Sequence, residues 1–156
     1  MMEIVVPGWR ELHLDTLVFD YNGTLALDGK ISAATEESLC RLAEQFEIHI
    51  LTSDTFGCVF AACRNLPVTI KKLESEDHSH EKANYLKQLG KERIAAIGNG
   101  ANDRWLVETA ALGIVVIGSE GCSTETLRHA DIAVNQIEDA FALLLNPKRL
   151  IATLRR

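Results

Sequence analysis

Four short segments of the sequence carry the side chains that phosphoryl transfer requires. Asp20 follows a buried-type apolar run and offers a carboxylate, which serves as a nucleophile or as a metal ligand. Thr52 and Ser53 follow a second run and offer hydroxyls and backbone N–H groups to a phosphate. Lys82 supplies a cation, and the segment Gly98–Asp103 supplies oxygen ligands of the kind that Mg²⁺ prefers. Together these are the parts of a phosphoryl-transfer site.

The elements that must position these segments are those of an α/β fold. Short β-branched runs alternate with amphipathic stretches, which predicts parallel strands covered by helices on both faces. The expected strands are 16–19, 48–51, 68–70, 94–97, 113–117 and 132–134. The expected helices are 33–46, 55–64, 79–89, 102–111, 123–129, 136–145 and a short basic helix within 147–156. An open, doubly wound sheet of this type binds ligands beyond the carboxyl ends of its strands.

Several helix ends are marked by residue type. Ser32 is expected to cap the helix that begins at residue 33, and Gly90 is placed to end the helix that begins at residue 79. Asn135 and Glu138 resemble a capping box for the helix that follows them. Asp54 is expected to cap the helix that begins near residue 55 rather than to take part in chemistry.

Three other segments are read from turn residues and polarity. Residues 3–6 and 11–14 flank Pro7-Gly8 and predict a hairpin attached to the edge of the sheet. Residues 25–31 predict a second small hairpin, because Asp28-Gly29 favours a tight turn. The acidic stretch 74–77, followed by His78 and His80, is interpreted as a solvated loop in preference to a metal site.

The composition limits the class of protein and its partners. The chain has 156 residues, 47% of them hydrophobic, with a formal net charge of −6. This is typical of one globular domain in solution and argues against nucleic acid or an anionic membrane surface as a partner. We expect no membrane span and no secretory signal. The four cysteines form no C-x-x-C pair, which favours reduced thiols and a cytoplasmic location.

The four chemical segments resemble motifs of one superfamily. The segment from Phe19 to Leu25 is similar to the DKTGTL motif of the P-type ATPases, and Leu51–Asp54 is similar to their LTGD motif. Lys82 resembles the family's motif lysine, and Gly98–Asp103 resembles the GDGxND loop. The chain is therefore identified as similar to the haloacid dehalogenase-like (HAD) superfamily, and within it to the phosphorylation domain of P-type ATPases, over roughly residues 16–145.

The resemblance implies a Rossmann-like core and a role for each motif residue. It implies that residues 1–156 form one HAD-like domain, with a hairpin at 1–15, the core at 16–145 and a helix at 146–156. Asp20 is the implied phosphate acceptor, with Asn22, Thr52 and Lys82 as the other catalytic positions. The implied Mg²⁺ site comprises Asp20, the Asn22 carbonyl, Asn99 and Asp103, and the implied phosphate contacts are Asn22, Gly23, Thr52, Ser53, Lys82 and Asn102.

The spacing between motifs leaves no room for a cap domain. Only 28 positions separate Thr24 from Thr52, and only 30 separate Thr52 from Lys82. The likeness to the pumps therefore extends neither to ion transport nor to ATP recognition. An uncapped site either needs a partner chain to exclude water or acts on an openly accessible substrate. A second copy of this chain is one candidate for such a partner.

Two motif positions depart from the superfamily pattern. HAD phosphatases carry an aspartate two residues after the nucleophile as their general acid and base, and this chain has Asn22 there. General acid–base catalysis contributes about 10²–10⁴ in rate, so we expect turnover to be slow. Asn99 replaces an aspartate of the metal loop and removes one negative charge, so we expect weakened metal binding.

These observations leave two hypotheses. In the first, the chain is an Mg²⁺-dependent HAD-type hydrolase or phosphatase that forms phospho-Asp20 slowly from a phosphorylated small molecule or a phosphoprotein. In the second, it is a non-catalytic phosphate-binding or regulatory module that has lost turnover. Asn22 and Asn99 favour the module, whereas the presence of Asp20, Thr52, Lys82 and Asp103 favours the enzyme, which is the hypothesis we prefer.

Overall fold

The centre of the molecule is a six-stranded parallel sheet. The structure is a computed structural model that describes residues 1–54 and 57–156. The strand order is β5-β4-β3-β6-β7-β8, as a doubly wound fold requires. The strands are β3 (Thr16–Asp20), β4 (Glu47–Thr52), β5 (Thr69–Lys72), β6 (Ile94–Gly98), β7 (Leu112–Val116) and β8 (Ile132–Val134). The expected α/β class and the expected strands are confirmed, with small shifts at the ends.

The strand order reverses between β3 and β6. The chain winds outward from β3 through β4 to β5, and then returns to add β6, β7 and β8 on the other side. Phe19 of β3 lies beside Ile97 of β6, so Asp20 projects at the point where the loops after these two strands separate. In open parallel sheets this switch point is where ligands bind.

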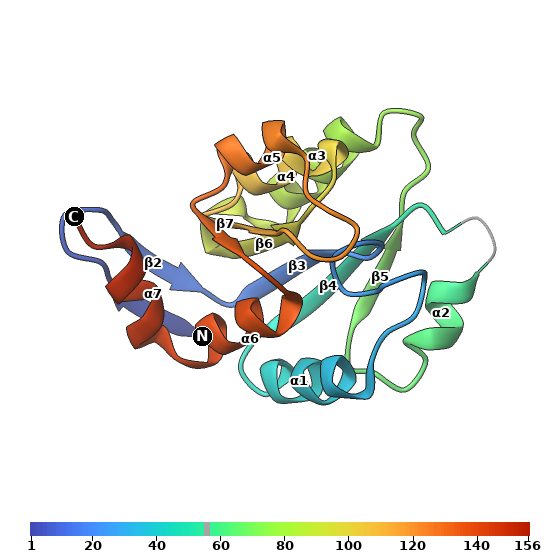
Figure 1. Ribbon diagram of the computed structural model, residues 1–156, viewed down its shortest axis with the longest axis horizontal. Helices are drawn as coiled ribbons and strands as arrows, with labels where there is room; N and C mark the ends of the chain where they lie inside the picture. The colour runs from blue at the N-terminus through green and yellow to red at the C-terminus, as the bar shows by residue number, and fades with distance from the viewer. Residues whose placement is uncertain (55–56) are drawn as a thin grey trace.

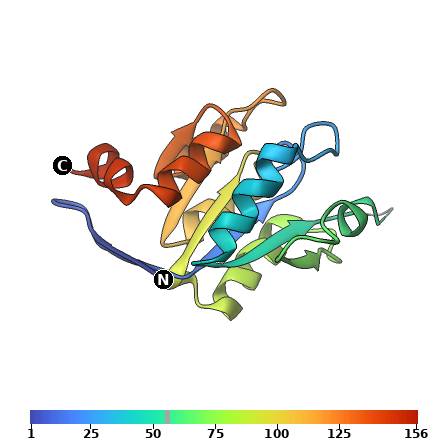
Figure 2. The ribbon, with the colours of Figure 1, turned by 90° about the horizontal axis from the view of Figure 1, so that it is seen from below.

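Helices cover both faces of the sheet (Figure 1). On one face lie α1 (Ala33–Ala43) and α6 (Ile137–Leu145), and Figure 2 shows α1 in front of the sheet. On the other lie α3 (His78–Leu89), α4 (Arg104–Thr109) and α5 (Thr124–His129). Side chains of β3 alternate between the two layers: Leu17 and Phe19 enter the core beneath α1 and α6, while Val18 enters the core beneath α3 and α4.

The helix ends agree with the sequence in most cases. The backbone N–H of Thr35 donates to Ser32 Oγ at 3.1 Å, so Ser32 caps α1 as expected. Gly90 ends α3 with φ of 95°, in the left-handed region that favours glycine. The capping box at Asn135 is wrong, because Gln136 is the cap residue of α6 and makes no side-chain bond to the helix end.

The helix expected at 55–64 is shorter than predicted. The described part is α2 (Cys58–Ala62), and the expected start at Thr55 lies outside the described residues. Gly57 rather than Asp54 is the cap residue of α2, but Asp54 still bonds to the first turn of the helix, because the N–H of Val59 donates to Asp54 Oδ2 at 2.8 Å. Likewise, the helix expected at 102–111 begins as a single 3₁₀ turn, η2 (Ala101–Asp103), before continuing as α4.

The N-terminal hairpin was expected at the edge of the main sheet, and that placement is wrong. β1 (Met2–Val5) and β2 (Glu11–Leu14) form a separate two-stranded antiparallel sheet. β2 leads directly into the central strand β3, so the hairpin lies beyond the amino end of the sheet rather than beside an edge strand (Figure 1). Its buried side chains share a core with Leu150 of α7 (Pro147–Leu154), and the N–H of Arg156 donates to Pro7 O at 3.0 Å.

The second expected hairpin is reduced to its turn. Leu27 and Lys30 form one antiparallel bridge, with backbone bonds of 3.1 and 3.0 Å. Asp28 and Gly29 have φ values of 50° and 76°, the two positive values of the tight turn that Asp-Gly favours. Tyr21 fixes this turn against the end of β3, because its hydroxyl donates to Gly29 O at 3.1 Å. The described residues between β3 and β4 thus hold this turn and α1, with no cap domain.

A close contact between α4 and β7 depends on a glycine. A Cβ atom added to Gly113 would lie 2.3 Å from the carbonyl oxygen of Val107. We therefore expect Gly113→Ala to lower the free energy of unfolding by about 1–3 kcal/mol, the usual cost of forcing a methyl group into a packed core. Urea denaturation of both proteins measures this difference. An unchanged unfolding midpoint would contradict the close packing of α4 on β7.

Neither membrane segments nor disulfides are found in the described residues. No helix among them has the length and apolar character needed to cross a bilayer. Cys40, Cys58, Cys63 and Cys122 all carry free thiols.

Candidate active site

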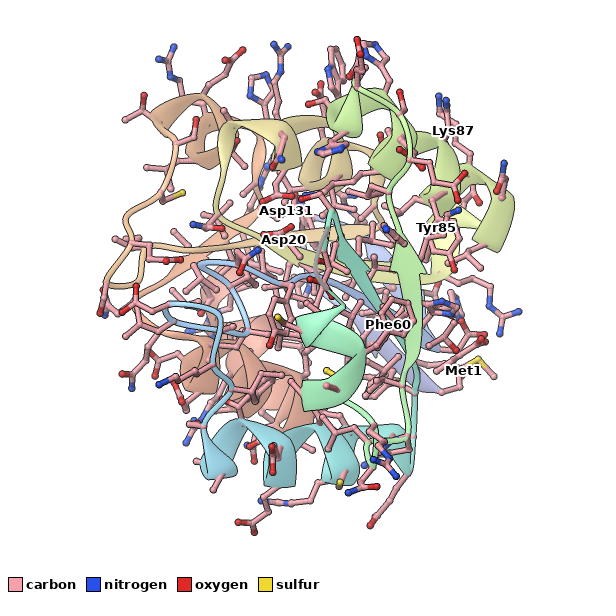
Figure 3. All side chains as sticks on the ribbon, turned by 90° about the vertical axis from the view of Figure 1, so that its right-hand side faces the viewer. Met1, Asp20, Phe60, Tyr85, Lys87 and Asp131 are labelled. Atoms are coloured by element: carbon pink, nitrogen blue, oxygen red, sulfur yellow. The ribbon has the colours of Figure 1, made fainter. Side chains whose placement is uncertain are left out.

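Asp20 lies at the carboxyl end of the central strand. The five residues of β3 are almost entirely buried, and the side chain of Asp20 keeps 13% of its surface exposed. Figure 3, which views the right-hand side of Figure 1, places Asp20 near the middle of this face, between the layer of α3, α4 and α5 and the layer of α1. The carboxylate is thus held by a rigid strand yet remains open to a ligand.

Lys82 approaches Asp20 from α3. Its Nζ atom lies 2.7 Å from Asp20 Oδ1, 2.6 Å from Asp103 Oδ1 and 3.3 Å from Asn102 Oδ1. The side chain is 1% exposed, so the ammonium is removed from water but satisfied by three oxygen acceptors. A buried lysine between two carboxylates is costly to assemble, and here it joins three segments that are distant in sequence.

Asp103 supports the loop that follows β6. Its Oδ2 atom accepts hydrogen bonds from the backbone N–H groups of Asn99 at 3.0 Å and Gly100 at 2.9 Å, and its Oδ1 atom contacts Lys82. A Cβ atom added to Gly98 would lie 2.6 Å from this side chain, so a glycine at that position permits the close approach. Asp103 has no exposed surface and lies beneath the site rather than on its wall.

Burial controls the electrostatics of these three groups. Burial and, to a smaller extent, the carboxylate of Asp103 raise the pKa of Asp20 to about 7, although Lys82 acts in the opposite direction. Burial alone lowers the pKa of Lys82, but Asp20 and Asp103 outweigh it and hold that pKa above its ordinary value. Two carboxylates therefore face one ammonium, and a further positive charge beside Asp20 favours its ionised form.

Thr52 ends β4, the strand next to β3, and is 2% exposed. Its hydroxyl oxygen accepts a hydrogen bond from the N–H of Asp54 at 3.1 Å, and its carbonyl accepts one from the N–H of Leu73 at 2.8 Å. These bonds fix the turn after β4 so that Thr52 and Ser53 face the same space as Asp20. Thr52 and Ser53 therefore line the same cavity as Asp20.

A polar cavity of about 170 Å³ brings these residues together. Seven of the predicted site residues line it, namely Asp20, Asn22, Thr52, Ser53, Lys82, Asn99 and Asn102; the other lining residues are Tyr21, Leu73, His78 and Gly100. The volume suits a phosphoryl group with the first atoms of its substituent. Two predicted residues do not line this cavity: Asp103 lies beneath it, and Gly23 lines a neighbouring cavity.

Gly23 serves the turn rather than the cavity wall. Its N–H donates to Ala26 O at 2.9 Å, and its φ is 77°. A Cβ atom at this position would lie 2.4 Å from Nδ2 of Asn99. Asn99 is in turn fixed at both ends, because its Oδ1 accepts from the Thr24 hydroxyl at 3.1 Å and its Nδ2 donates to Gly121 O at 3.1 Å.

His78 is a lining residue that the sequence argument assigned to a solvated loop. It is instead the first residue of α3, four positions before Lys82 and therefore on the same side of the helix. The i, i+4 spacing to Lys82 is the signal that would have identified it. His80, by contrast, bonds to Asp77, with its Nδ1 atom 2.7 Å from Asp77 Oδ2, and Asp77 caps α3. Among the described residues, no group of three or more His, Cys, Asp or Glu side chains could hold a metal ion.

The fold agrees with that of known phosphatases. The structure superposes on 3-deoxy-D-manno-octulosonate 8-phosphate phosphatase of Moraxella catarrhalis, in complex with magnesium, phosphate and KDO, with a TM-score of 0.66 and 22% identity over 92% of this chain and 94% of that one. The cobalt-bound enzyme of Haemophilus influenzae gives a TM-score of 0.74 with 13% identity, over 88% and 90% of the two chains. The chain therefore has the HAD-like fold of these phosphatases.

A protein of similar sequence shows the family to which this chain belongs. The chain is 47% identical over 91 residues to the uncharacterized protein MJ0073 of Methanocaldococcus jannaschii, a match that spans 54% of this chain and 98% of that protein. The chain therefore belongs to the same family as MJ0073. It is also 49% identical over 39 residues to the uncharacterized protein MJ0072 of the same organism, covering 25% of this chain and 89% of that protein. No protein-family model matches the chain.

Proposed function

We propose that the chain is a Mg²⁺-dependent phosphohydrolase of the HAD type that forms a phospho-aspartate at Asp20. The observation that carries this proposal is the buried Lys82 ammonium, which lies 2.7 Å from Asp20 at the wall of a small polar cavity. A lysine in this position neutralises charge on the nucleophile and on an incoming phosphoryl group.

Five of the lining residues take part in the proposed phosphoryl transfer. A carboxylate oxygen of Asp20 attacks phosphorus, the bond from phosphorus to the leaving oxygen breaks, and phospho-Asp20 forms. The hydroxyls of Thr52 and Ser53 and the amide of Asn102 hold the phosphoryl oxygens while Lys82 balances their charge. Water then attacks phosphorus, and phosphate leaves while Asp20 is regenerated.

The cavity fits a divalent cation. Asp20, Asn22 and Asn99 line it together and offer a carboxylate, a backbone carbonyl and an amide oxygen, which are donors that suit Mg²⁺. The excess of carboxylate charge in the Asp20–Lys82–Asp103 cluster also favours a cation. When bound, Mg²⁺ supplies neutralisation of the charge on the phosphoryl group. Asp103 holds the loop that carries Asn99 behind this position.

The proposed substrate is a phosphorylated small molecule or an exposed phosphoprotein side chain. No cap domain lies between β3 and β4 in the described residues, so the cavity opens directly to its surroundings. The two superposed structures are of octulosonate 8-phosphate phosphatases, which are named for a phosphorylated small molecule. A second copy of the chain is a candidate for covering the open site and excluding water.

Phosphorylation of Asp20 is the direct test. We expect incubation with Mg²⁺ and acetyl phosphate to add one phosphoryl group to the protein, with peptide mapping locating it on Asp20. The matched control is Asp20→Asn, which keeps the size of the side chain but removes the nucleophile, and it should take up no label. Label on another residue, or equal label in Asp20→Asn, would overturn the proposal.

A second candidate function is a phosphate-binding module without turnover. The presence of amides at positions 22 and 99, where HAD phosphatases carry acids, favours it. In that case inorganic phosphate should bind with Mg²⁺ in calorimetry, yet neither phospho-Asp20 nor released product should form. Covalent labelling of Asp20 excludes this alternative.

A further inference from the structure

Four of the five histidines are held by neighbouring groups. His13 lies 3.2 Å from Glu11 and 3.5 Å from Glu3, and His80 lies 2.7 Å from Asp77. His49 is buried, with one ring nitrogen 2.9 Å from the Tyr85 hydroxyl and the other 2.9 Å from Glu47; His129 lies 2.7 Å from the carbonyl of Glu125. His78 alone has no hydrogen bond or ion pair to its ring among the described residues, and it is the one histidine that lines the cavity with Asp20.

The fold directs His78 toward the reacting groups. Residues four apart on a helix lie on the same face, so His78 stands one turn before Lys82 on the side of α3 that meets the site. Asp77, the residue before it, caps the helix by accepting a hydrogen bond from the N–H of His80 at 3.1 Å, which fixes where α3 begins. His78 and Asn102 also line a second, more open cavity, beside Ala101. His78 is therefore shared by the cavity that contains Asp20 and its more open neighbour.

The other ionisable residues that line the cavity are unsuited to moving a proton near neutral pH. Asp20 is the proposed nucleophile, and Lys82 is committed to two carboxylates that keep it protonated. Burial raises the pKa of Tyr21 to about 12, and its hydroxyl is already donated to Gly29 O. Asn22, at the position of the usual acid and base of the superfamily, has no proton to exchange. An imidazole is the side chain whose charge changes most readily near neutral pH.

We propose that His78 is the general acid and base of the reaction proposed above, in the role that Asn22 leaves vacant; the inference rests on that proposed function. In the first half-reaction, imidazolium His78 gives a ring proton to the leaving oxygen as the bond from phosphorus to that oxygen breaks. In the second, neutral His78 takes a proton from the water that attacks phosphorus, and the bond to Asp20 breaks. His78 returns to imidazolium, and the products are an alcohol and phosphate.

Charged groups of several elements lie around His78. Asp20 of β3 and Lys82 of α3 line the same cavity as His78, and Glu76 and Asp77 line the second, more open cavity with it. Asp103, which pairs with Lys82, is fully buried. Because the same group acts as an acid and then as a base, loss of His78 should slow both half-reactions when the leaving group needs a proton.

The experiment measures the two half-reactions separately in His78→Ala and His78→Gln. With acetyl phosphate, whose leaving group needs no protonation, we expect phospho-Asp20 to form as in the parent chain but to be hydrolysed about 10²-fold more slowly, so that it accumulates. With aryl phosphates, the loss in phosphorylation should be larger for phenyl phosphate than for 4-nitrophenyl phosphate. Added imidazole should restore hydrolysis in His78→Ala but not in His78→Gln, where the site is filled.

His80→Ala is the matched control, since His80 lies two positions further along α3 and bonds to Asp77 outside the cavity. It should hydrolyse phospho-Asp20 at the parent rate. Unchanged hydrolysis in both His78 variants would overturn the role of His78 while leaving the phospho-Asp20 proposal in place. Absence of phospho-Asp20 in the parent chain would instead overturn the proposed function, and the role of His78 with it.

Discussion

Replacement of Lys82 by methionine is expected to destabilise the protein by about 3–5 kcal/mol and to abolish phosphorylation of Asp20. The methionine preserves the length of the side chain but removes the ammonium that lies 2.7 Å from Asp20 and 2.6 Å from Asp103. Asp103 is fully buried, and its ion-pair partner among the described residues is Lys82, so its charge would then be unpaired within that part of the chain. Removal of one partner from a buried ion pair is costly because the remaining charge cannot recover its hydration.

The matched control for this variant is Lys87→Met, on the same helix. Lys87 is exposed in the last turn of α3, and Figure 3 shows it at the periphery, away from Asp20. Urea denaturation should give nearly the same free energy of unfolding for Lys87→Met as for the parent chain. In Lys82→Met, a second substitution, Asp20→Asn, should recover part of the lost stability because it removes one of the two unpaired carboxylates. A loss below about 1 kcal/mol in Lys82→Met, the scale of an exposed pair, would contradict the buried bridge.

Asn22→Asp is expected to raise the rate of phospho-Asp20 hydrolysis, by about 10²–10⁴-fold in the His78→Ala background. The substitution changes one atom of the side chain and supplies a carboxylate at a position that already lines the cavity with Asp20. Single-turnover decay of the labelled protein measures this step apart from substrate binding. Asn99→Asp is the matched control. It adds the same charge to the loop after β6, so it should raise the affinity for Mg²⁺ without supplying a proton donor.

Two further results bear on the same variant. If His78 already moves protons, the gain from Asn22→Asp should be larger in the His78→Ala background than in the parent chain, because the two groups then substitute for each other. Asn22 and Asn99 each precede glycine, a pair prone to deamidation, so intact mass should confirm that the parent preparation is fully amidated. No gain in hydrolysis from Asn22→Asp would contradict the placement of residue 22 beside the reacting phosphoryl group.

The sequence predicted the core of the fold because local pattern and long-range packing agree there. The run that ends at Asp20 is apolar on both faces, as a central parallel strand must be, and its neighbours β4 and β6 are almost entirely buried. The predicted placement of the hairpin at 1–15 was wrong because local pattern does not reveal its long-range packing. Its two strands are readable locally, but their cover is supplied by Leu150 of α7, at the other end of the chain. Pattern within a segment carries no information about such a distant partner.

The residues of the site also fall into those that the sequence predicts and those that it does not. Asp20, Thr52, Lys82 and Asn102 were expected together because the carboxyl ends of parallel strands and the adjoining helix face one edge of the sheet. His78 was missed because a histidine in a polar stretch is uninformative until the start of α3 is known to within a residue. Gly23 was expected at the phosphate, yet its N–H is used inside the turn by Ala26, a bond that depends on the exact path of the loop.

The two carboxylate oxygens of Asp103 connect the proposed cation site and the proposed phosphate site. One oxygen holds the backbone of Asn99 and Gly100, and the other holds Lys82. In the proposed site, a cation beside Asn99 and an anion beside Lys82 would both contact groups that this one buried side chain holds in place. We therefore expect their binding free energies to be linked, so that saturation with either ion would change the affinity for the other by the same factor.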